Sequence, residues 1–370
     1  MKIVMIGPVY PFKGGISHYT GLMYRELSKK HDVMMISFKM QYPKLLYKKE
    51  QRDYSNDSFQ IEDTRYLLNT VNPLNWIQTA KAIKREKPDL IIMQWWHIYF
   101  APCYYMLNRI LKKTKKLYIC HNVFPHERVP LDRRITRMVL KHGDRFVVHS
   151  HLDQADLLSL KPDARHVVTP HPTYDIFKMH SLSGKAAREW LCIDESKHVI
   201  LFFGFVREYK GLKHLLRAMP MISELIPDVQ LWVVGDFGSD KQDYIDMIDE
   251  LGIAGQIKLV AGYVPDQEVE KYFAAADLVV LPYESATQSG IVQISYGFEK
   301  PVVVTDVGGL PDVVEDGKTG YVVRAKDSKA LADAVVKYFT EDRKEELTNN
   351  IKAAAHRFSW EVMAQEIEAL

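Results

Sequence analysis

The chain has 370 residues, of which 47% are hydrophobic and 26% charged, and this composition is typical of a globular protein rather than a disordered or fibrous one. The length exceeds the usual range of one domain and predicts two. No run of 18 apolar residues is present, so we expect no transmembrane helix, and the start MKIVMIGPVYP is typical of a first strand rather than a signal peptide.

The three cysteines show no spacing typical of a metal or redox site. They stand far apart in the sequence, at Cys103, Cys120 and Cys192. Unpaired thiols of this kind fit a reducing compartment better than secretion. We therefore expect a cytoplasmic protein with free thiols and without a metal site.

The net charge of +2 conceals a strong asymmetry along the chain. Residues 1–172 carry 28 Lys and Arg against 15 Asp and Glu, whereas residues 173–370 carry 21 against 32. A basic half of this kind usually meets an anionic partner. Its cations form three clusters, at residues 44–52, at residues 109–116, and at Arg133, Arg134 and Arg137.

The first two basic clusters mix lysines with Leu, Ile or Tyr. This mixture suits an anionic membrane surface, where apolar side chains bury and ammonium groups meet lipid phosphates. A solvated helix face is the alternative interpretation. No nucleic-acid-binding motif accompanies the charge, so we expect no nucleic acid partner.

Strand-like and helix-like segments alternate along almost the whole chain. We expect strands at residues 2–6, 32–37, 89–94, 117–121, 145–149, 166–169, 198–203, 229–234, 257–260, 277–281 and 301–305. We expect helices at residues 15–30, 75–86, 102–113, 131–142, 153–160, 211–224, 240–251, 266–275, 290–298 and 328–340. The apolar runs lack a period of two, as do parallel strands that are covered on both faces. The sequence therefore predicts an α/β fold with doubly wound parallel sheets.

The boundary between the two expected domains lies in TPHPTYDIFKMH, near residues 170–180. Pro170 and Pro172 favour an extended connection at this place. We therefore expect Rossmann-like domains at residues 1–172 and 173–357. The amphipathic last segment, residues 358–370, is expected to pack back on the first domain.

The turn after the first strand, GPVYPFKGG, is the first candidate site. Gly14 and Gly15 would let a ligand approach the backbone without a Cβ in the way, although they also suit a simple tight turn. His18 and Tyr19 follow on the first turn of the helix. We interpret Gly14, His18 and Tyr19 as candidates for contact with a ligand.

Two more candidates stand where strands of the first half end. His121, followed by Asn122, ends an apolar strand, and open α/β sheets bind ligands beyond such ends, although a lone histidine is often structural. QWWH at 94–97 ends another strand. Its tryptophans suit the core or a wall on which a sugar stacks, and Trp96 and His97 are further candidates for contact with a ligand.

In the second half of the chain, the segment LFFGFVREYKG contains two cationic side chains suited to binding an anion. Gly204 ends a strand, and Arg207 and Lys210 follow before a helix. The planar fork of Arg207 and the compact charge of Lys210 would neutralise a diphosphate leaving group without a metal. Surface salt bridges are the alternative.

Two turns of the second half suit parts of a nucleotide. Ser289 and Gly290 end the loop YESATQSG just before a helix, where unpaired N–H groups and the helix dipole favour an anion such as phosphate. Tyr263 and Val264 follow another strand and can present backbone groups to a planar base. Asp316-Gly317 is interpreted as a hairpin turn without chemistry.

Taken in order, these segments resemble a known family. A GG turn, His121 at a strand end, FVREYKG, GYVPDQEVEKYFAAADLVVLPY, SATQSG and KPVVVTDVGGLPDVVEDGKTGYVV closely resemble the GT-B glycosyltransferases of family 4, also called group 1. The resemblance spans almost the full chain and is most specific in its second half. It implies a GT-B fold of two Rossmann-like domains with an interdomain cleft, in which the second domain binds a nucleotide-sugar donor and the first an acceptor.

The resemblance also implies roles for individual residues. Arg207 and Lys210 would hold the donor diphosphate, and His121 would contact the transferred sugar. The residues on the acceptor side would be Gly14, His18, Tyr19, Trp96 and His97. The remaining donor-binding residues would be Gly15, Gly204, Tyr263, Val264, Glu284, Thr287, Gln288, Ser289 and Gly290. The family is retaining, reacts without an essential protein nucleophile, and needs no metal or cofactor where cations neutralise the diphosphate.

Two departures from the family pattern affect the nucleotide contacts. The family usually has two glutamates around this loop, and they fall at Ala286 and Ile294 in this chain. Glu284 lies two residues early and is the candidate substitute for the first. His121-Asn122 stands where His-Asp is frequent.

The sequence therefore predicts a retaining, metal-independent glycosyltransferase that moves a sugar from a nucleotide sugar, first of all a UDP-sugar, to a glycan acceptor. The basic first domain indicates a lipid-linked acceptor in polysaccharide or glycoconjugate biosynthesis, with peripheral contact at the inner face of the cell membrane. A nucleotide-sugar epimerase or hydrolase on the same scaffold is one alternative and would need a pair of acid/base carboxylates. A non-catalytic nucleotide-sugar-binding protein is another.

Overall fold

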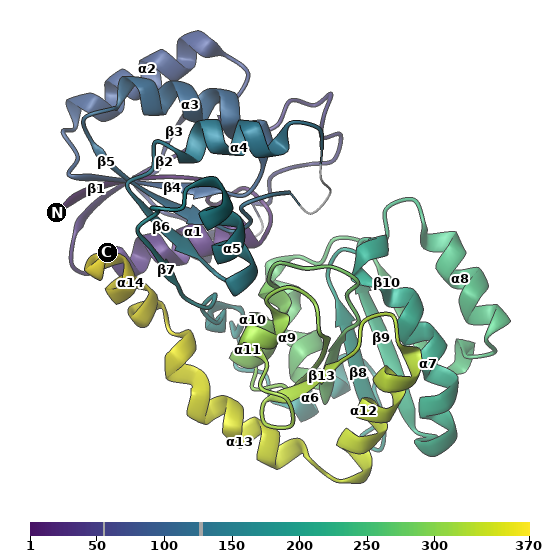
Figure 1. The fold of residues 1–370 in the computed structure, drawn as a ribbon. Coiled ribbons are helices and arrows are strands. Elements are labelled where there is room, and N and C mark those ends of the chain that lie inside the picture. Colours follow the sequence, from purple (N-terminus) through teal and green to yellow (C-terminus); the bar gives the residue numbers. More distant parts are fainter. Residues whose placement is uncertain (55, 126–128) are drawn as a thin grey trace. The chain divides into compact units, whose positions relative to one another are not determined.

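The computed structural model describes residues 1–54, 56–125 and 129–370, which form two compact units. Unit 1 comprises Met1–Pro170 and Trp360–Leu370, and unit 2 comprises His171–Ser359. Each unit is built on a parallel sheet of its own (Figure 1).

Unit 1 contains a seven-stranded sheet in which all neighbouring strands are parallel. The spatial order is β3 (Arg65–Asn69), β2 (Asp32–Met40), β1 (Lys2–Ile6), β4 (Leu90–Trp95), β5 (Lys115–Cys120), β6 (Arg145–Val148) and β7 (His166–Val168). The order reverses between β1 and β4. Open α/β sheets bind ligands at the carboxyl ends of the strands beside such a reversal.

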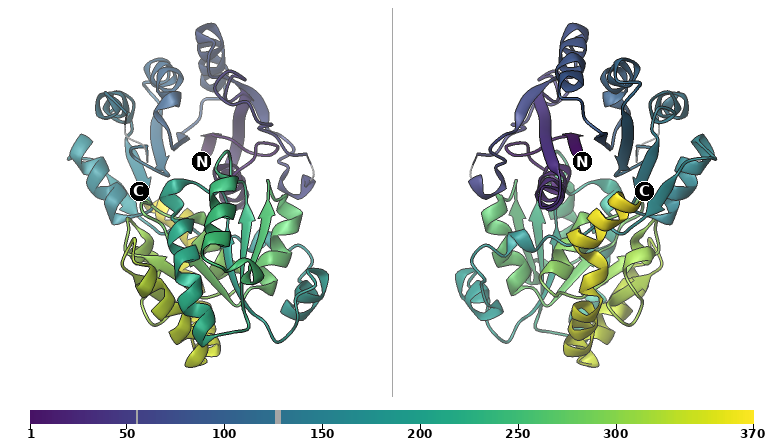
Figure 2. Two further views of the ribbon diagram at one scale, coloured as in Figure 1. Left: turned by 90° about the vertical axis from the view of Figure 1, so that its right-hand side faces the viewer. Right: turned by 90° about the vertical axis from the view of Figure 1, so that its left-hand side faces the viewer.

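Helices cover both faces of the unit 1 sheet, as Figure 2 shows. One face carries α2 (Pro73–Arg85), α3 (Ala101–Ile110), α4 (Asp132–Leu140) and α5 (His151–Leu160), and the other carries α1 (Gly15–Leu27) and α14 (Trp360–Ala369). Val4 and Ile6 of β1 enter the first core, whereas Ile3 and Met5 enter the second. Successive strand residues are thus buried on opposite faces, which explains the apolar runs without alternation.

Unit 2 contains a six-stranded parallel sheet. The order is β10 (Ile257–Ala261), β9 (Val229–Gly235), β8 (His198–Phe203), β11 (Leu278–Leu281), β12 (Val302–Thr305) and β13 (Gly320–Val323). Here the reversal lies between β8 and β11.

The helices of unit 2 also form two layers. α7 (Leu212–Leu225), α8 (Lys241–Glu250), α12 (Ser328–Thr340) and α13 (Lys344–Ala354) contribute to the core over one face. α6 (Gly184–Trp190), α9 (Asp266–Ala275), α10 (Gly290–Gly297) and the short α11 (Leu310–Val313) complete the unit. On the second face, the ring of Phe273 in α9 lies 5.0 Å from that of Phe203 in β8. Short 3-10 helices lie at Asp57–Phe59 (η1), Ile98–Phe100 (η2), Asp175–Phe177 (η3), Glu208–Lys210 (η4), Ala254–Gln256 (η5) and Ala355–Phe358 (η6).

The predicted α/β class with two Rossmann-like parallel sheets is confirmed. The predicted hairpin turn at Asp316-Gly317 is wrong, because β13, which follows it, pairs parallel to β12. Asp316 instead accepts a hydrogen bond from the backbone N–H of Val322 at 2.9 Å. Among the described helices, none is long and apolar enough to cross a bilayer.

Candidate functional site

The loops after β8 and β11 meet at the carboxyl edge of the unit 2 sheet, beside the reversal of strand order. The backbone N–H of Glu284 donates to the carbonyl of Tyr209 at 2.7 Å. Gly211 has φ +66°, and a Cβ there would lie 1.9 Å from the carbonyl oxygen of Pro282. Only a glycine permits this close approach. The two loops therefore form one surface at the place where doubly wound folds bind ligands.

Lys210 is held at this edge by aromatic rings. Its Nζ lies 3.7 Å from the centre of the Tyr283 ring and 5.4 Å from that of Tyr209. A cation above an aromatic face is attracted by the ring quadrupole, so these rings fix the ammonium group. Within the described part of the chain, Lys210 forms no ion pair with a carboxylate. Its charge therefore remains available to an anion.

Arg207 is held by backbone carbonyls instead. Its Nη1 donates to the carbonyl of Val206 at 2.9 Å and lies 3.5 Å from that of Asp236, after β9. A Cβ at Gly238 would lie 3.1 Å from the same nitrogen. The guanidinium also lies over the half-exposed ring of Phe205. No carboxylate among the described residues pairs with Arg207, so a surface salt bridge does not account for it either.

The segment SATQSG ends in the helix cap of α10. The hydroxyl of Ser289 accepts from the backbone N–H of Ile291 at 3.3 Å. Gly290 is the first residue of the helix, and Tyr283 lies beneath the loop with its hydroxyl 3.4 Å from that of Ser289. The exposed N–H groups at such a helix start, with the helix dipole, favour an anion.

The loop after β12 packs against the segment SATQSG and forms a hydrogen bond with it. The backbone N–H of Gly309 donates to the carbonyl of Thr287 at 2.9 Å, and Gly308 has φ +54°. A Cβ at Gly308 would lie 1.5 Å from the carbonyl oxygen of Ala286. The hydroxyl of Thr305 donates to the carbonyl of Tyr283 at 2.6 Å. These contacts fix the position of SATQSG relative to the sheet.

Glu284 is the centre of an ion-pair cluster on the same loop. Its Oε1 lies 2.9 Å from Nζ of Lys213 and 2.9 Å from Nε2 of His214, and its Oε2 lies 3.0 Å from Nζ of Lys326. Burial disfavours the charged carboxylate, but hydrogen bonds from Lys213, Lys326 and His214 outweigh it and lower the pKa of Glu284 to about 2. Both carboxylate oxygens are thus engaged by protein groups. Ala286 and Ile294, where the family carries glutamates, are 5% and 8% exposed.

The ends of β8, β9 and β10 are joined by glycines. A Cβ at Gly235 would lie 1.7 Å from the carbonyl oxygen of Gly204, and the N–H of Gly262 donates to the carbonyl of Gly235 at 2.9 Å. Tyr263 and Val264 follow directly, and Tyr263 is 40% exposed. The structure thus places these two residues two strands away from Gly204, along the same carboxyl edge.

His121 belongs to a buried polar cluster in unit 1. It follows β5, is 2% exposed, and its Nε2 lies 2.8 Å from Oε1 of Gln94 in β4. Its ring contacts the rings of Tyr19 at 4.7 Å and His149 at 5.6 Å. Trp360 of α14 contacts Tyr19 at 5.1 Å. The cluster therefore joins the ends of β4, β5 and β6 to α1 and to the last helix of the chain.

Gln94 and His149 are members of this cluster that sequence reasoning missed. Gln94 is fully buried, and a Cβ at Gly7 would lie 2.5 Å from its Cγ. Burial lowers the pKa of His149 to about 4, against a hydrogen bond to the carbonyl of Thr169. A polar residue at the end of an apolar strand, as in IIMQ and FVVH, is the sequence signal that identifies both.

The start of α1 is not crowded by other elements. Gly14 has φ +105°, and apart from the adjacent residues and the backbone of α1 itself, no described atom lies within 4 Å of a Cβ built at Gly14 or Gly15. The ring of His18 lies 4.5 Å from that of Phe59. Tyr19, by contrast, is fully buried. The structure thus separates Tyr19, which packs in the core, from the other candidates of this turn.

The QWWH segment divides into core and surface. Trp95 is 1% exposed and donates to the carbonyl of Val123 at 3.2 Å. Trp96 is half-buried against the ring of Phe100, 4.1 Å away, and donates to the hydroxyl of Tyr42 at 3.2 Å. His97 is exposed and caps the next turn. Trp95 is therefore a core residue, and Trp96 packs at the edge of the core.

The structure brings the predicted site residues into two groups, one in each unit. The unit 2 group lies on the loops that follow β8, β10 and β11, and consists of Gly204, Arg207, Lys210, Tyr263, Val264, Glu284, Thr287, Gln288, Ser289 and Gly290. The unit 1 group lies at the start of α1 and after β4 and β5, and consists of Gly14, Gly15, His18, Tyr19, Trp96, His97 and His121.

Sequence comparisons match both halves of the chain to glycosyltransferase families. The profile described as "Glycosyl transferases group 1" matches residues 185–358, and the profile described as "Glycosyltransferase Family 4" matches residues 13–176. The matches fall in unit 2 and mainly in unit 1, respectively.

Curated relatives include D-inositol 3-phosphate glycosyltransferases. That of Corynebacterium aurimucosum is 29% identical over 247 residues, which cover 64% of this chain and 58% of that protein. That of Corynebacterium urealyticum is 30% identical over 257 residues, which cover 66% and 60%. The chain thus spans less than two thirds of the length of these relatives.

Solved structures of similar fold cover the whole chain. Sucrose-phosphate synthase from Thermosynechococcus elongatus superimposes with a TM-score of 0.77 at 18% identity, covering 100% of this chain and 97% of that chain. Anabaena Alr3699/HepE in complex with UDP-glucose gives a TM-score of 0.75 at 20% identity, covering 100% and 98%. At these identities the likeness establishes the fold.

Proposed function

Because this chain belongs to the group 1 glycosyltransferases of glycosyltransferase family 4, we propose that it transfers a sugar from a nucleotide sugar to a glycan acceptor. Unit 2 binds the donor and unit 1 the acceptor. The observation that carries this proposal is the pair of cations on the loop joined to SATQSG, Arg207 and Lys210, which have no carboxylate partner among the described residues.

The cations act on the leaving group. As the bond between the anomeric carbon and the diphosphate breaks, negative charge grows on the diphosphate oxygens. Arg207 offers a planar fork and Lys210 a fixed point charge, and the start of α10 adds N–H groups. Groups positioned before the reaction stabilise developing charge without reorganisation, so these residues replace a metal ion in the mechanism.

The transfer retains the anomeric configuration. The acceptor hydroxyl attacks from the face that the diphosphate leaves, and its proton passes to a diphosphate oxygen, so that no protein nucleophile is required. His121 binds the transferred sugar, with its ring orientation set by Gln94 at 2.8 Å. Tyr263 and Val264 flank the base. At the start of α1, Gly15 belongs to the donor side and Gly14 to the acceptor side.

The donor is a UDP-sugar and the acceptor a lipid-linked glycan of polysaccharide or glycoconjugate assembly, reached from the cytoplasmic side. Support for UDP comes from the fold shared with a protein whose structure holds UDP-glucose. Support for an anionic lipid-linked acceptor comes from the basic first half of the chain. An epimerase or hydrolase would need a carboxylate pair in the site, whereas the loop carboxylate of Glu284 is already engaged by three partners.

A two-part experiment tests the proposal. UDP and UDP-sugars are expected to raise the melting temperature of the purified protein more than the corresponding CDP compounds do, because a ligand of the native state stabilises it. The same protein, given a labelled UDP-sugar and a membrane extract, is expected to form a glycosylated product with retained configuration in the presence of a chelator. Tight binding of UDP-sugars with neither product nor slow hydrolysis would favour a binding protein instead.

A further inference from the structure

Unit 1 displays two adjacent leucines outside its core, in the loop between β2 and η1. We call residues 44–49 the tip; its side chains, Lys44, Leu45, Leu46, Tyr47, Lys48 and Lys49, are all exposed. Leu45 is 87% and Leu46 63% exposed, and Leu45 is the most exposed large hydrophobic residue described. Single exposed leucines are ordinary, but two neighbours flanked by three lysines form an amphipathic surface.

The base of the tip is anchored to the body of the unit. The side chain of Gln51 accepts from the backbone N–H of Tyr42 at 3.2 Å and donates to its carbonyl at 2.9 Å. The rings of Tyr42 and Tyr47 stack at 6.1 Å. The carbonyl of Gln51 accepts from the backbone N–H of Lys13 at 3.0 Å. The leucines are therefore held away from the core by an ordered base, which is also bonded to the turn that contains Gly14.

A second exposed apolar segment lies next to this base. The hydroxyl of Thr70, after β3, donates to the carbonyl of Gln41 at 2.8 Å. The residues that follow include Val71, 49% exposed, and Leu74, 71% exposed, at the start of α2. Because β2 and β3 are parallel neighbours, both segments leave the sheet at its carboxyl edge.

The second basic cluster, residues 109–116, differs from the tip. It spans the end of α3 and the start of β5, at the amino edge of the sheet. Of its apolar members, Leu111 is 3% exposed and Ile110 is partly buried. Lys116 is buried too, and its Nζ donates to the carbonyl of Thr114 at 2.8 Å. This cluster presents cations without an apolar surface, so the solvated-face interpretation applies to it.

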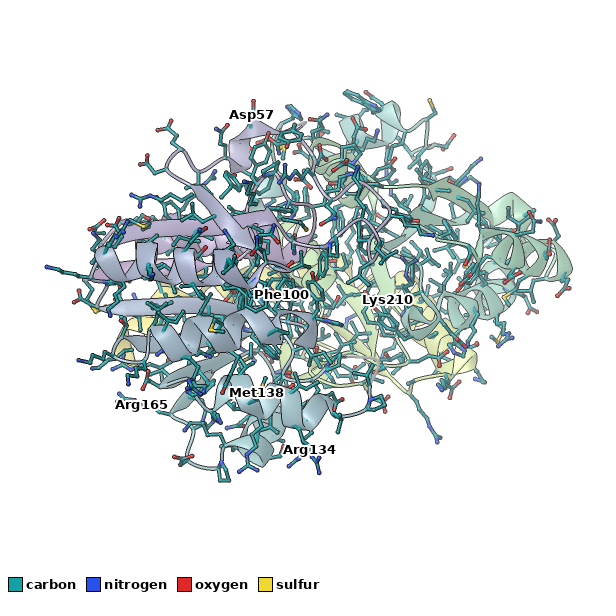
Figure 3. The ribbon with its side chains drawn as sticks, turned by 90° about the horizontal axis from the view of Figure 1, so that it is seen from above. Asp57, Phe100, Arg134, Met138, Arg165 and Lys210 are labelled. Atoms are coloured by element: carbon teal, nitrogen blue, oxygen red, sulfur yellow. The ribbon has the colours of Figure 1, made fainter. Side chains whose placement is uncertain are left out.

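The third cluster belongs to α4. Figure 3 shows Arg134 and Met138 of α4 at one end of unit 1 and Asp57, which follows the loop of the tip, at the other, with Phe100 between them. Arg133 is turned toward α5, where it donates to the carbonyl of Ser159 at 2.7 Å. Exposed apolar residues also lie beside the third cluster, with Val129 at 43% and Leu131 at 60%, but the cations there are arginines. Among the described residues of the three clusters, the tip is the one that combines two adjacent exposed leucines with lysines.

We propose that the tip, with Val71 and Leu74, docks on the surface of an anionic lipid bilayer. The leucines enter the boundary between headgroups and acyl chains, and the lysines meet lipid phosphates. Charge complementarity favours an anionic bilayer as the partner of the tip. The tip carries three lysines and belongs to the half of the chain in which cations exceed carboxylates. The inference rests on the proposed function in one respect: docking brings the open start of α1 close to a lipid-linked acceptor.

Vesicle sedimentation of the full chain tests the inference, with phosphatidylcholine vesicles that contain or lack phosphatidylglycerol. Wild type is expected to bind the anionic vesicles, and binding to weaken as salt rises. Leu45→Ser with Leu46→Ser should weaken binding on the order of tenfold per leucine. Lys44→Gln, Lys48→Gln and Lys49→Gln together should weaken it on the order of a hundredfold.

A matched control carries the same change of charge at the other edge of the sheet. Lys112→Gln, Lys113→Gln and Lys115→Gln together should leave vesicle binding within about twofold of wild type. Equal losses in the tip and control variants, or binding that ignores salt, would overturn the inference. So would self-association of wild type that the double serine variant abolishes while vesicles are not bound, because the tip would then join two copies. Vesicle binding needs no nucleotide sugar, so its failure with an intact UDP-dependent thermal shift would leave the proposed function standing.

Discussion

The ammonium nitrogen of Lys210 lies 3.7 Å from the centre of the Tyr283 ring, and this contact joins the loop after β8 to the loop after β11. Tyr283 is 1% exposed, and its carbonyl accepts the hydroxyl of Thr305 from β12. The position of the cation is therefore set by three strands of the sheet rather than by a carboxylate. A charge fixed in this way is ready to stabilise an anion before that anion arrives.

Removal of either cation is expected to slow the transfer. Lys210→Ala and Arg207→Ala should each remove about 2–4 kcal/mol of transition-state stabilisation. This loss corresponds to a fall in kcat/KM of roughly 30- to 1,000-fold. Initial rates with a UDP-sugar and membrane extract measure the loss. Lys329→Ala, which breaks a surface pair with Asp333 at 2.7 Å, is the control and should leave the rate unchanged. Full activity in both cation variants would show that the diphosphate lies elsewhere.

Glu284 is expected to make stability depend on pH in the acidic range. Its pKa is about 2 in the folded protein, below the ordinary value of 4.5, so its pairing is fully stabilising above about pH 4.5 and is lost as pH falls toward 2. Glu284→Gln should therefore lower the free energy of unfolding by about 3 kcal/mol near neutral pH. The difference from wild type should shrink as the medium becomes acidic.

Urea unfolding at a series of pH values measures this difference. Asp333→Asn serves as the comparison, because its partner Lys329 is exposed and such a pair contributes less than about 1 kcal/mol. If the free energies of unfolding of wild type and Glu284→Gln differ by the same amount at every pH, packing rather than ionisation accounts for the contribution of Glu284 to stability.

Gly308 is expected to be essential for the shape of SATQSG. Gly308 at φ +54° and Gly252 at φ +66° share a backbone conformation, but a Cβ at Gly308 would meet the carbonyl of Ala286, whereas none of the described atoms lies within 4 Å at Gly252. Gly252→Ala should cost about 1 kcal/mol of stability, the price of the left-handed conformation alone. Gly308→Ala should cost more and also weaken UDP binding, because the loop must shift.

Thermal melts with and without UDP separate the two effects. Gly252→Ala should melt earlier but show the same UDP-induced shift as wild type. A Gly308→Ala protein with an unchanged UDP-induced shift would indicate that SATQSG is not a nucleotide-binding loop.

The sequence predicted the structure best where a short stretch of residues determines it, as in a buried strand or a turn. Long apolar runs predicted the parallel strands, and the class was confirmed. β3 was missed because its first residues, Arg65 and Tyr66, are exposed at the sheet edge, and β13 because it begins with a glycine and is only partly buried at the edge of the unit 2 sheet. An edge or short strand lacks the apolar run that identifies a central one.

Side-chain partnerships were less predictable. Glu284 was identified as a substitute for a ligand-binding glutamate, whereas its partners Lys213 and Lys326 come from distant segments that only the fold brings together. The basic clusters at 44–52 and 109–116 looked alike in sequence. Their difference arises from burial and from the opposite edges of the sheet at which they lie, and neither is visible in composition.

Gln94 is expected to set the orientation of His121. The side-chain oxygen of Gln94 lies 2.8 Å from Nε2 of His121, and a hydrogen bond between the two buried side chains holds the ring. Gln94→Leu removes this hydrogen bond in a buried place, which should cost about 1–3 kcal/mol of stability and lower kcat more than it raises KM. Gln94→Glu keeps an acceptor oxygen at the same place.

Separate measurements of kcat and KM distinguish positioning from packing. If His121 binds the sugar, Gln94→Glu should recover part of the kcat that Gln94→Leu loses, because it keeps an acceptor for the ring. Gln154→Glu is the matched control, because Gln154 pairs with His166 at 2.9 Å on another part of unit 1. A Gln94→Leu protein that loses stability but keeps the kcat of wild type would show that the Gln94–His121 hydrogen bond serves only the fold.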